Sequence, residues 1–201
     1  GNLEPVKVGV IGCGYWGPNL VRNFHEIPQA DLQMVCDLSQ ERLDHTRSRY
    51  PTVQTTRSYQ DLLDSDIEAV VIATPHGSHA SLVATALAAG KHVFVEKPLA
   101  LGRDELGEVA AAQNRSAAFF QCGFNRRFAP YAIAARDHMA RAGGKKFVVV
   151  RINAGALPPE SALNSAENGY GRLLGEACHF VDLARFLVGS RIASVHAMAA
   201  R

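Results

Sequence analysis

Two titratable side chains late in the chain have the spacing of a proton-transfer pair. His179 and Asp182 are three residues apart in an apolar helical pattern, and Glu176 lies three residues before His179. Residues three apart on a helix share a face. A carboxylate beside an imidazole orients the ring and raises its basicity, which suits a general base for an alcohol proton. We therefore predict catalytic roles for His179 and Asp182; a buried structural histidine paired with Asp182 is the alternative, and no further ligands complete a metal site.

A third candidate for catalysis is Lys97, which lies in the tripeptide Glu96-Lys97-Pro98 directly after the strand-like run 92–95. In sheets of parallel strands, ligands bind beyond the carboxyl ends of the strands. An ammonium group at such an end can meet the oxygen of a substrate. A solvated lysine at the end of a strand is the alternative interpretation.

The run Gly12-Cys13-Gly14-Tyr15-Trp16-Gly17 has the pattern G-x-G-x-x-G. The pattern alone is weak, but here it follows an apolar strand at 6–11 and opens a helix at 16–26. Gly12 permits a tight turn, Gly14 lets the backbone approach a pyrophosphate, and Gly17 lets helix and strand pack closely. The helix N-terminus offers free N–H groups to phosphates. This context predicts a dinucleotide site, although a glycine turn in another α/β protein has the same letters.

Asp37 ends the second predicted strand, twenty residues after Gly17. A carboxylate there accepts hydrogen bonds from the ribose hydroxyls of an adenosine and repels a 2′-phosphate. NAD is therefore favoured over NADP, although Arg42, one helical turn later, keeps NADP possible. Asp37 as a plain turn residue is the alternative.

A polar loop, Thr74 to His79, follows the fourth predicted strand. Its place at the carboxyl end of that strand predicts that Thr74, Pro75 and His79 line the cofactor cleft. Two alternatives stay open, because Ser78 also suits a helix N-cap and His79 also suits a partly buried helix position.

The elements that must position these groups alternate between strand and helix over the first 120 residues. Continuous Val/Ile runs and regular alternation predict an α/β fold, a doubly wound parallel Rossmann sheet at residues 1–122. The expected strands are at 6–11, 32–36, 53–55, 69–73, 92–95 and 118–122, and the expected helices are at 16–26, 40–50, 59–63, 78–89 and 103–114.

After Gly123 the regular alternation of predicted strands and helices ends. We expect helices at 130–142 and 173–188, and strands at 146–153 and from 192 onward. Two strands make a marginal sheet. The pattern therefore predicts that residues 123–201 begin an α+β domain that is incomplete here.

Composition narrows the function classes. The chain has 201 residues, a formal charge of +2 and 47% hydrophobic residues. Its Lys and Arg residues are scattered, so we expect no nucleic-acid or membrane partner. No signal peptide is recognisable, and the four cysteines are far apart, so we expect a cytoplasmic protein with reduced thiols and no metal site. These cysteines are Cys13, Cys36, Cys122 and Cys178.

Taken together, these motifs resemble those of the glucose–fructose oxidoreductase / inositol dehydrogenase / MocA family (Gfo/Idh/MocA), and above all those of the oxidoreductase half of its bi-domain members. The resemblance runs through the whole chain and is carried by five segments, GCGYWG, ATPHGSH, VEKPLAL, GFNRRFAP and GEACHFVDLARFLVG.

The resemblance implies hydride transfer between nicotinamide and a hydroxyl-bearing carbon of a sugar, sugar acid, sugar nucleotide or cyclitol. Lys97 would bind or polarise the reacting oxygen, and His179 would exchange its proton. The residues implied at the cofactor NAD(P) are Gly12, Gly14, Tyr15, Trp16, Gly17, Asp37, Thr74, Pro75, His79, Glu96, Lys97, Asn125 and Arg126.

Two departures from the family pattern are visible. Many members have Asp four residues before the histidine, where this chain has Gly175, and Glu176 is displaced from that position by about 100° of helix rotation. Members also continue with a large open sheet that walls the substrate cleft and often forms a subunit interface, so we expect a homo-oligomer at full length. A dinucleotide-binding module without turnover is the alternative function.

Overall fold

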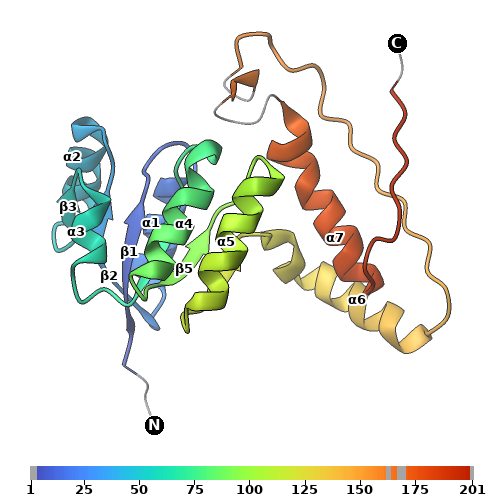
Figure 1. Ribbon diagram of the computed structural model, residues 1–201, viewed down its shortest axis with the longest axis horizontal. Helices are drawn as coiled ribbons and strands as arrows, with labels where there is room; N and C mark the ends of the chain where they lie inside the picture. The colour runs from blue at the N-terminus through green and yellow to red at the C-terminus, as the bar shows by residue number, and fades with distance from the viewer. Residues whose placement is uncertain (1–3, 162–163, 167–170, 200–201) are drawn as a thin grey trace.

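Figure 1 shows the computed structural model, which describes residues 4–161, 164–166 and 171–199. Its centre is one parallel sheet in the order β3-β2-β1-β4-β5-β6. The six strands are β1 (Val6–Ile11), β2 (Ala30–Cys36), β3 (Gln54–Thr56), β4 (Ala69–Ile72), β5 (His92–Val95) and β6 (Phe120–Cys122).

The helices between the strands agree with the predicted ones to within a residue or two at their ends. The helices of this part are α1 (Gly17–Glu26), α2 (Gln40–Arg49), α3 (Tyr59–Leu63), η1 (His76–Ser78), α4 (His79–Ala88) and α5 (Arg103–Arg115). The predicted doubly wound parallel sheet is confirmed.

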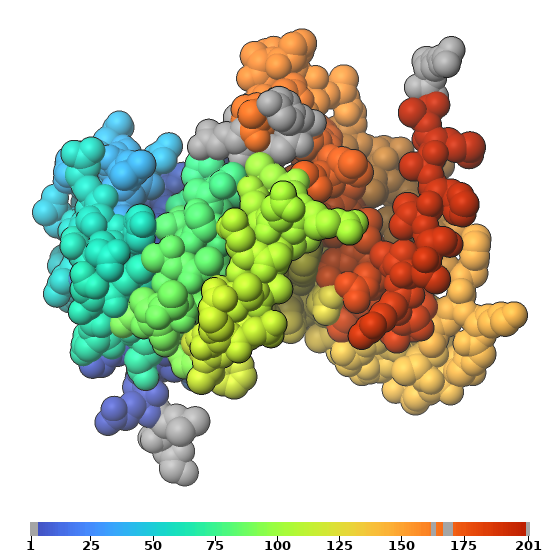
Figure 2. Space-filling view, viewed as in Figure 1, coloured from blue at the N-terminus to red at the C-terminus, as the bar shows by residue number. Residues whose placement is uncertain are grey.

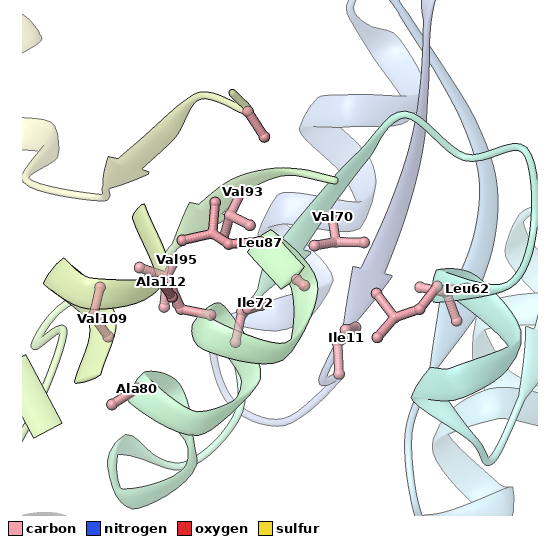
Figure 3. Close-up of a cluster of buried hydrophobic side chains, with 14 of the residues drawn as sticks. Ile11, Leu62, Val70, Ile72, Ala80, Leu87, Val93, Val95, Val109 and Ala112 are labelled. Carbon is pink, nitrogen blue, oxygen red and sulfur yellow. The ribbon is translucent and has the colours of Figure 1, made fainter. Parts of the chain in front are cut away.

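Helices cover both faces of the sheet, and each face has its own apolar core. On one face, α3, α4 and α5 pack against residues such as Ile11, Ile72 and Val95, as the close-up in Figure 3 shows. On the other face, α1 and α2 pack against Val10 and Val71. Neighbouring strand residues therefore point to opposite cores, which explains why the strands read as continuous apolar runs.

The strand order changes direction between β1 and β4. From β1 the chain moves outward through β2 to β3, then returns to place β4 on the other side of β1. Connections after β1 and β4 therefore leave the sheet in opposite directions. Such a switch point is where doubly wound sheets bind ligands.

Beyond β6 the chain forms helices that pack on each other beside the sheet (Figures 1 and 2). These elements are the 3-10 helix η2 (Asn125–Phe128), α6 (Pro130–Ala142), the π-helix η5 (Leu173–Ala177) and α7 (Cys178–Val188). The helix expected at 173–188 is thus present, but its first turn is a π-helix, where the regular helical ladder is interrupted.

The two strands predicted in this region are absent from the part of it that the structure describes. Residues 146–153 and 192–199 are extended but pair with no neighbour among the described residues. A run of apolar residues such as 147–150 forms a strand only where another strand supplies hydrogen bonds. Both predictions are therefore wrong for this structure. None of the described helices is long and apolar enough to span a membrane.

Candidate functional site

The loop after β1 is fixed by two glycines that no other residue can replace without movement. Gly12 has φ +100°, and a Cβ there would lie 2.6 Å from the Ala73 carbonyl oxygen. A Cβ on Gly17 would lie 2.0 Å from the carbonyl oxygen of Gly12. The tight turn and the close helix–strand approach predicted for these positions are both present.

Gly14 differs, because its surroundings are open. A Cβ there would meet only Nη1 of Arg42, at 3.8 Å. The helix that follows has no side-chain cap at Trp16. In its first turn Pro18 has no N–H and the Asn19 N–H donates to the Trp16 carbonyl oxygen at 3.0 Å, so the Gly17 N–H is the group left to bind an acceptor. An open backbone at Gly14 beside the N-terminus of a helix is the arrangement that accommodates a pyrophosphate. The residues present therefore fit a dinucleotide.

Asp37 is buried and ties this loop to the end of β2. Its Oδ2 accepts a hydrogen bond from the Cys13 N–H at 2.7 Å, and its Oδ1 accepts one from the Ser39 N–H at 2.8 Å. Arg42 Nη1 lies 3.7 Å from Oδ1. Each carboxylate oxygen has a second lone-pair site. Asp37 can thus hold the loop and still accept ribose hydroxyls, and its ribose contact stays a prediction.

His79 is fully buried, with its ring between two loops. Its Nδ1 lies 2.7 Å from the Pro98 carbonyl oxygen and its Nε2 lies 2.8 Å from that of Thr74. Burial lowers the pKa of the imidazole. The ring therefore joins the loops after β4 and β5, and the prediction that this side chain lines the cofactor site stays a prediction. Thr74 is partly exposed and Pro75 is exposed in front of it.

Glu96 lies half-buried at the end of β5. The Lys97 N–H donates a hydrogen bond to its Oε2 at 3.3 Å, and the Trp16 side chain lies near the carboxyl group. Burial raises the pKa of the carboxyl, and these two neighbours lower it in part. Tyr15, next to Trp16, is almost wholly exposed.

Lys97 joins the sheet to the second region. A cis peptide bond joins Lys97 to Pro98, where the next loop begins. The Lys97 ammonium donates a hydrogen bond to the Gly175 carbonyl oxygen at 2.7 Å. This contact brings the π-helix to the carboxyl edge of β5. The predicted neighbourhood of Lys97 and His179 is therefore present, although 82 residues separate them in the sequence.

His179 is partly buried and lies near two positive charges. Its Nδ1 is buried and has no hydrogen-bond partner among the described residues. The pKa of the imidazole falls to about 4, chiefly through burial and then through the positive charges of Lys97 and Arg126. The expectation of a raised basicity is therefore wrong, because burial and two cations outweigh the carboxylate of Asp182.

Asp182 does not pair with the imidazole. Its two oxygens accept hydrogen bonds from Arg127, one of them 2.6 Å from Nε, in a bidentate ion pair. Arg127 also lies over the ring of Phe186, and Arg126 lies over that of Phe180, 4.7 Å from its centre. Asp182 therefore fastens α7 to η2, and the predicted orienting role on His179 is corrected.

Glu176 is paired with a different arginine from that of Asp182. It lies 3.5 Å from Arg172, four residues earlier. Asn125 is exposed beside Phe124, whose ring meets that of His179 edge-on. In the part of the chain that the structure describes, no cluster of His, Cys, Asp and Glu could hold a metal ion.

Sequence reasoning did not find Arg127 or the Gly175 carbonyl. Their contacts join positions 55 and 78 residues apart, so no local spacing could reveal them. The only available signal for Arg127 was its neighbour Arg126 in the segment GFNRRF.

A family model described as "Oxidoreductase family, NAD-binding Rossmann fold" (GFO_IDH_MocA) matches residues 6–124, more than half of the chain. The chain belongs to this family. The match begins with β1 and ends two residues after β6, so it coincides with the sheet described above.

Relatives and solved structures extend the similarity beyond the sheet. The chain is 32% identical to scyllo-inositol 2-dehydrogenase (NAD(+)) of Bacillus subtilis over 94% of its length, and 34% identical to inositol 2-dehydrogenase of Rhizobium meliloti over 97%. Among solved structures, that of GenD2 from gentamicin A biosynthesis in complex with NAD has a TM-score of 0.78 and 26% identity, over 93% of this chain and 54% of that one. The chain spans 56–58% of the length of the two inositol dehydrogenases.

Proposed function

We propose that this chain is the cofactor-binding part of an NAD-dependent oxidoreductase that transfers a hydride between nicotinamide and a CH–OH carbon of a cyclitol or sugar. One observation carries the proposal: the glycine loop and the Lys97–His179 neighbourhood meet at the same carboxyl edge of the sheet. Membership of the family and the names of the inositol dehydrogenases support it.

The dinucleotide would lie across the crevice between the glycine loop and the ends of β4 and β5. The amides at Gly14 and the start of α1 would bind its pyrophosphate, and Asp37 would accept the hydroxyls of its adenosine ribose. When bound, NAD would supply the carbon that accepts or donates the hydride. Asp37 favours NAD over NADP, although Arg42 lies within 3.7 Å of Asp37.

The chemistry left to the chain is binding and proton transfer. The Lys97 ammonium would donate a hydrogen bond to the reacting oxygen and stabilise negative charge on it. His179, whose pKa of about 4 keeps it neutral near pH 7, would accept the proton of the alcohol and return it in the reverse direction. The Arg127–Asp182 pair would hold α7 in place while this happens.

The low pKa of the His179 imidazole determines the pH range in which the ring can act as a base. A base that protonates only near pH 4 stays available in mildly acidic solution. The same value makes it a weak base, so removal of the alcohol proton depends on stabilisation of the alkoxide by Lys97. Hydride transfer is therefore expected to need both residues together.

We extend the proposal to the organisation of the protein. Residues 1–122 form the cofactor domain, and residues 123–201 form part of a second domain that contributes to the substrate cleft. We propose a cytoplasmic homo-oligomer with no nucleic-acid or membrane partner. The near-neutral charge of the chain supports the last point.

Calorimetric titration of the chain with NADH and then NADPH tests the cofactor assignment. We expect NADH to bind more tightly, and Asp37→Ala to weaken NADH binding and reduce the preference for it. Asp31→Ala is the matched control, because Asp31 is exposed near the opposite end of the same strand. Failure of both nucleotides to bind would overturn the proposal, and equal affinities in the Asp37 variant and the parent would remove Asp37 from the site.

A further inference from the structure

The Lys97 ammonium is paired with no carboxylate among the described residues. It donates a hydrogen bond to the Gly175 carbonyl oxygen, which is a neutral acceptor. Its neighbour Glu96 accepts the backbone N–H of Lys97 instead, and none of the ion pairs found in the described chain includes Lys97. Because an ammonium group has three N–H donors, Lys97 keeps both its charge and further donors for a ligand.

Arg126 is a second cation of this kind. It lies in η2, just beyond the carboxyl end of β6, and its guanidinium stacks on the ring of Phe180, 4.7 Å from the ring centre. Stacking uses the face of the guanidinium and leaves the N–H groups along its edge for other partners. Arg126 is exposed, and no acidic side chain pairs with it in the part of the chain that the structure describes. Close by, Phe124 meets the ring of His179 edge-on, with centroids 6.3 Å apart.

The two cations flank His179. Gly175, which accepts the hydrogen bond from Lys97, lies four residues before this histidine, and Phe180, which carries the guanidinium of Arg126, directly follows it. The pKa of the imidazole is lowered first by burial and then by these two positive charges. Lys97 and Arg126 therefore converge on the position where the proposed proton transfer would take place.

The acidic side chains around this position are already committed to other groups. Asp182 accepts two hydrogen bonds from Arg127, and Glu176 lies 3.5 Å from Arg172. Glu96 is half-buried, and burial raises the pKa of its carboxyl. Even with Glu96 ionised, the arginines and the lysine named in this subsection outnumber its carboxylates by one. The substrate end of the proposed site thus has an excess of positive charge.

A cleft with an excess of one sign of charge concentrates ligands of the opposite sign. The edge of a guanidinium also fits a carboxylate through two parallel hydrogen bonds. Resting on the proposed function, we propose that the substrate is a sugar acid whose carboxylate is bound by Arg126 while its reacting hydroxyl lies between Lys97 and His179. A single excess charge matches one carboxylate, whereas a phosphate monoester carries about two negative charges.

Calorimetry on the chain saturated with NADH tests this substrate class. The ligands are methyl glucuronide and methyl glucoside, which differ only in having a carboxylate or a CH₂OH group at C6, and the 6-phosphate of the same glucoside. Because an alcohol does not react with NADH, each titration measures binding alone. The variants are Arg126→Ala and Arg126→Lys. Arg115→Ala is the matched control, since Arg115 is exposed at the end of α5, near the amino end of β6.

We expect methyl glucuronide to bind about tenfold more tightly than methyl glucoside, the contribution of one charge-assisted hydrogen-bonded contact that solvent partly screens. Arg126→Ala should reduce this preference to about two- to threefold, because Lys97 still attracts the anion. Arg126→Lys keeps the charge without the planar edge and should give an intermediate preference. Arg115→Ala should keep the preference of the parent. Added salt should weaken binding of the glucuronide more than that of the glucoside.

Three outcomes would overturn the inference alone while NADH still binds. The first is no tighter binding of the glucuronide than of the glucoside, and the second is tighter binding of the 6-phosphate than of the glucuronide. The third is an unchanged preference in Arg126→Ala, which together with a loss of NADH affinity would assign Arg126 to the cofactor. Failure of the parent chain to bind NADH would instead overturn the proposed function. Far-UV circular dichroism checks that each variant is folded.

Discussion

The sheet region and the helical region after it are built in different ways. Every buried hydrophobic residue of the described chain lies between Val8 and Ala118. After residue 124, the only buried residues among those described are Gly175 and Asp182. The first region therefore has two apolar cores of its own, whereas the second has none of comparable size.

Polar and aromatic contacts hold the second region instead. Arg127 pairs with Asp182, and the guanidinium groups of Arg127 and Arg136 both lie over the ring of Phe186. Lys97 fastens η5 to the end of β5. The difference shows that the sheet region, with its many local apolar patterns, forms its own packed cores. Helix α7, in contrast, is positioned by charged groups from segments that are distant in the sequence.

The largest expected effect tests where the core ends. Leu87→Ala removes a buried side chain from α4 and should lower the free energy of unfolding by about 2–5 kcal/mol. Leu173→Ala makes the same chemical change on an exposed side chain of η5 and should change it by less than about 0.5 kcal/mol. Urea unfolding of both variants measures the contrast, and equal losses would refute the division drawn above.

A smaller effect concerns the glycine loop. Gly17→Ala places a Cβ 2.0 Å from the Gly12 carbonyl oxygen, so we expect a loss of about 1–3 kcal/mol and loss of NADH binding. Gly107→Ala is the control, because nothing lies within 4 Å of a Cβ in that part of α5. This variant should gain about 0.5–1 kcal/mol and keep its affinity for NADH. Retained NADH binding in Gly17→Ala would contradict the close packing.

The Arg127–Asp182 pair should matter locally. Arg127→Ala leaves the buried Asp182 carboxylate without its donors, at a cost of about 1–2 kcal/mol once the partial exposure of Arg127 is discounted. Because the pair joins η2 to α7, amide hydrogen exchange should speed up in α7 and stay unchanged in α1. Arg136→Ala serves as the comparison, since Arg136 also covers Phe186 but pairs with the exposed Asp137. Equal acceleration in α1 and α7 would count against a local role.

The smallest effect is a pH dependence. The pKa of His179 in the folded chain, about 4, lies below its ordinary value of 6.5, so the unfolded chain takes up this proton first as the pH falls. His179 therefore lowers the free energy of unfolding between about pH 6.5 and pH 4, and has no such effect above that window. His179→Gln should show a shallower loss over the same window. Identical slopes for parent and variant in urea unfolding would show that the pKa is not depressed.

Most of the sheet could be predicted because its signals are local. Val/Ile runs, glycine spacing and short polar joints lie within single elements, and β1, β5 and α3 have the predicted bounds. The segment 146–153 was wrongly predicted as a strand, because its apolar run at 147–150 is a local signal, whereas a strand also requires a neighbouring strand. The π-helix before α7 left no recognisable mark in the sequence.

The site was predictable in outline but not in its contacts. The types and places of Lys97, His179 and Asp182 brought them correctly to one neighbourhood. Which group each one binds was decided by residues far away in sequence, Gly175 for Lys97 and Arg127 for Asp182. The two ring partners of His79 could not be predicted, because both are backbone carbonyls, which every sequence contains.

Those two carbonyls give His79 a further consequence. A neutral imidazole carries one N–H, so it can donate to the Pro98 carbonyl or to the Thr74 carbonyl, but not to both at once. A neutral ring therefore leaves one of the loops after β4 and β5 without its hydrogen bond, whereas an imidazolium would donate to both carbonyls and hold the two loops together.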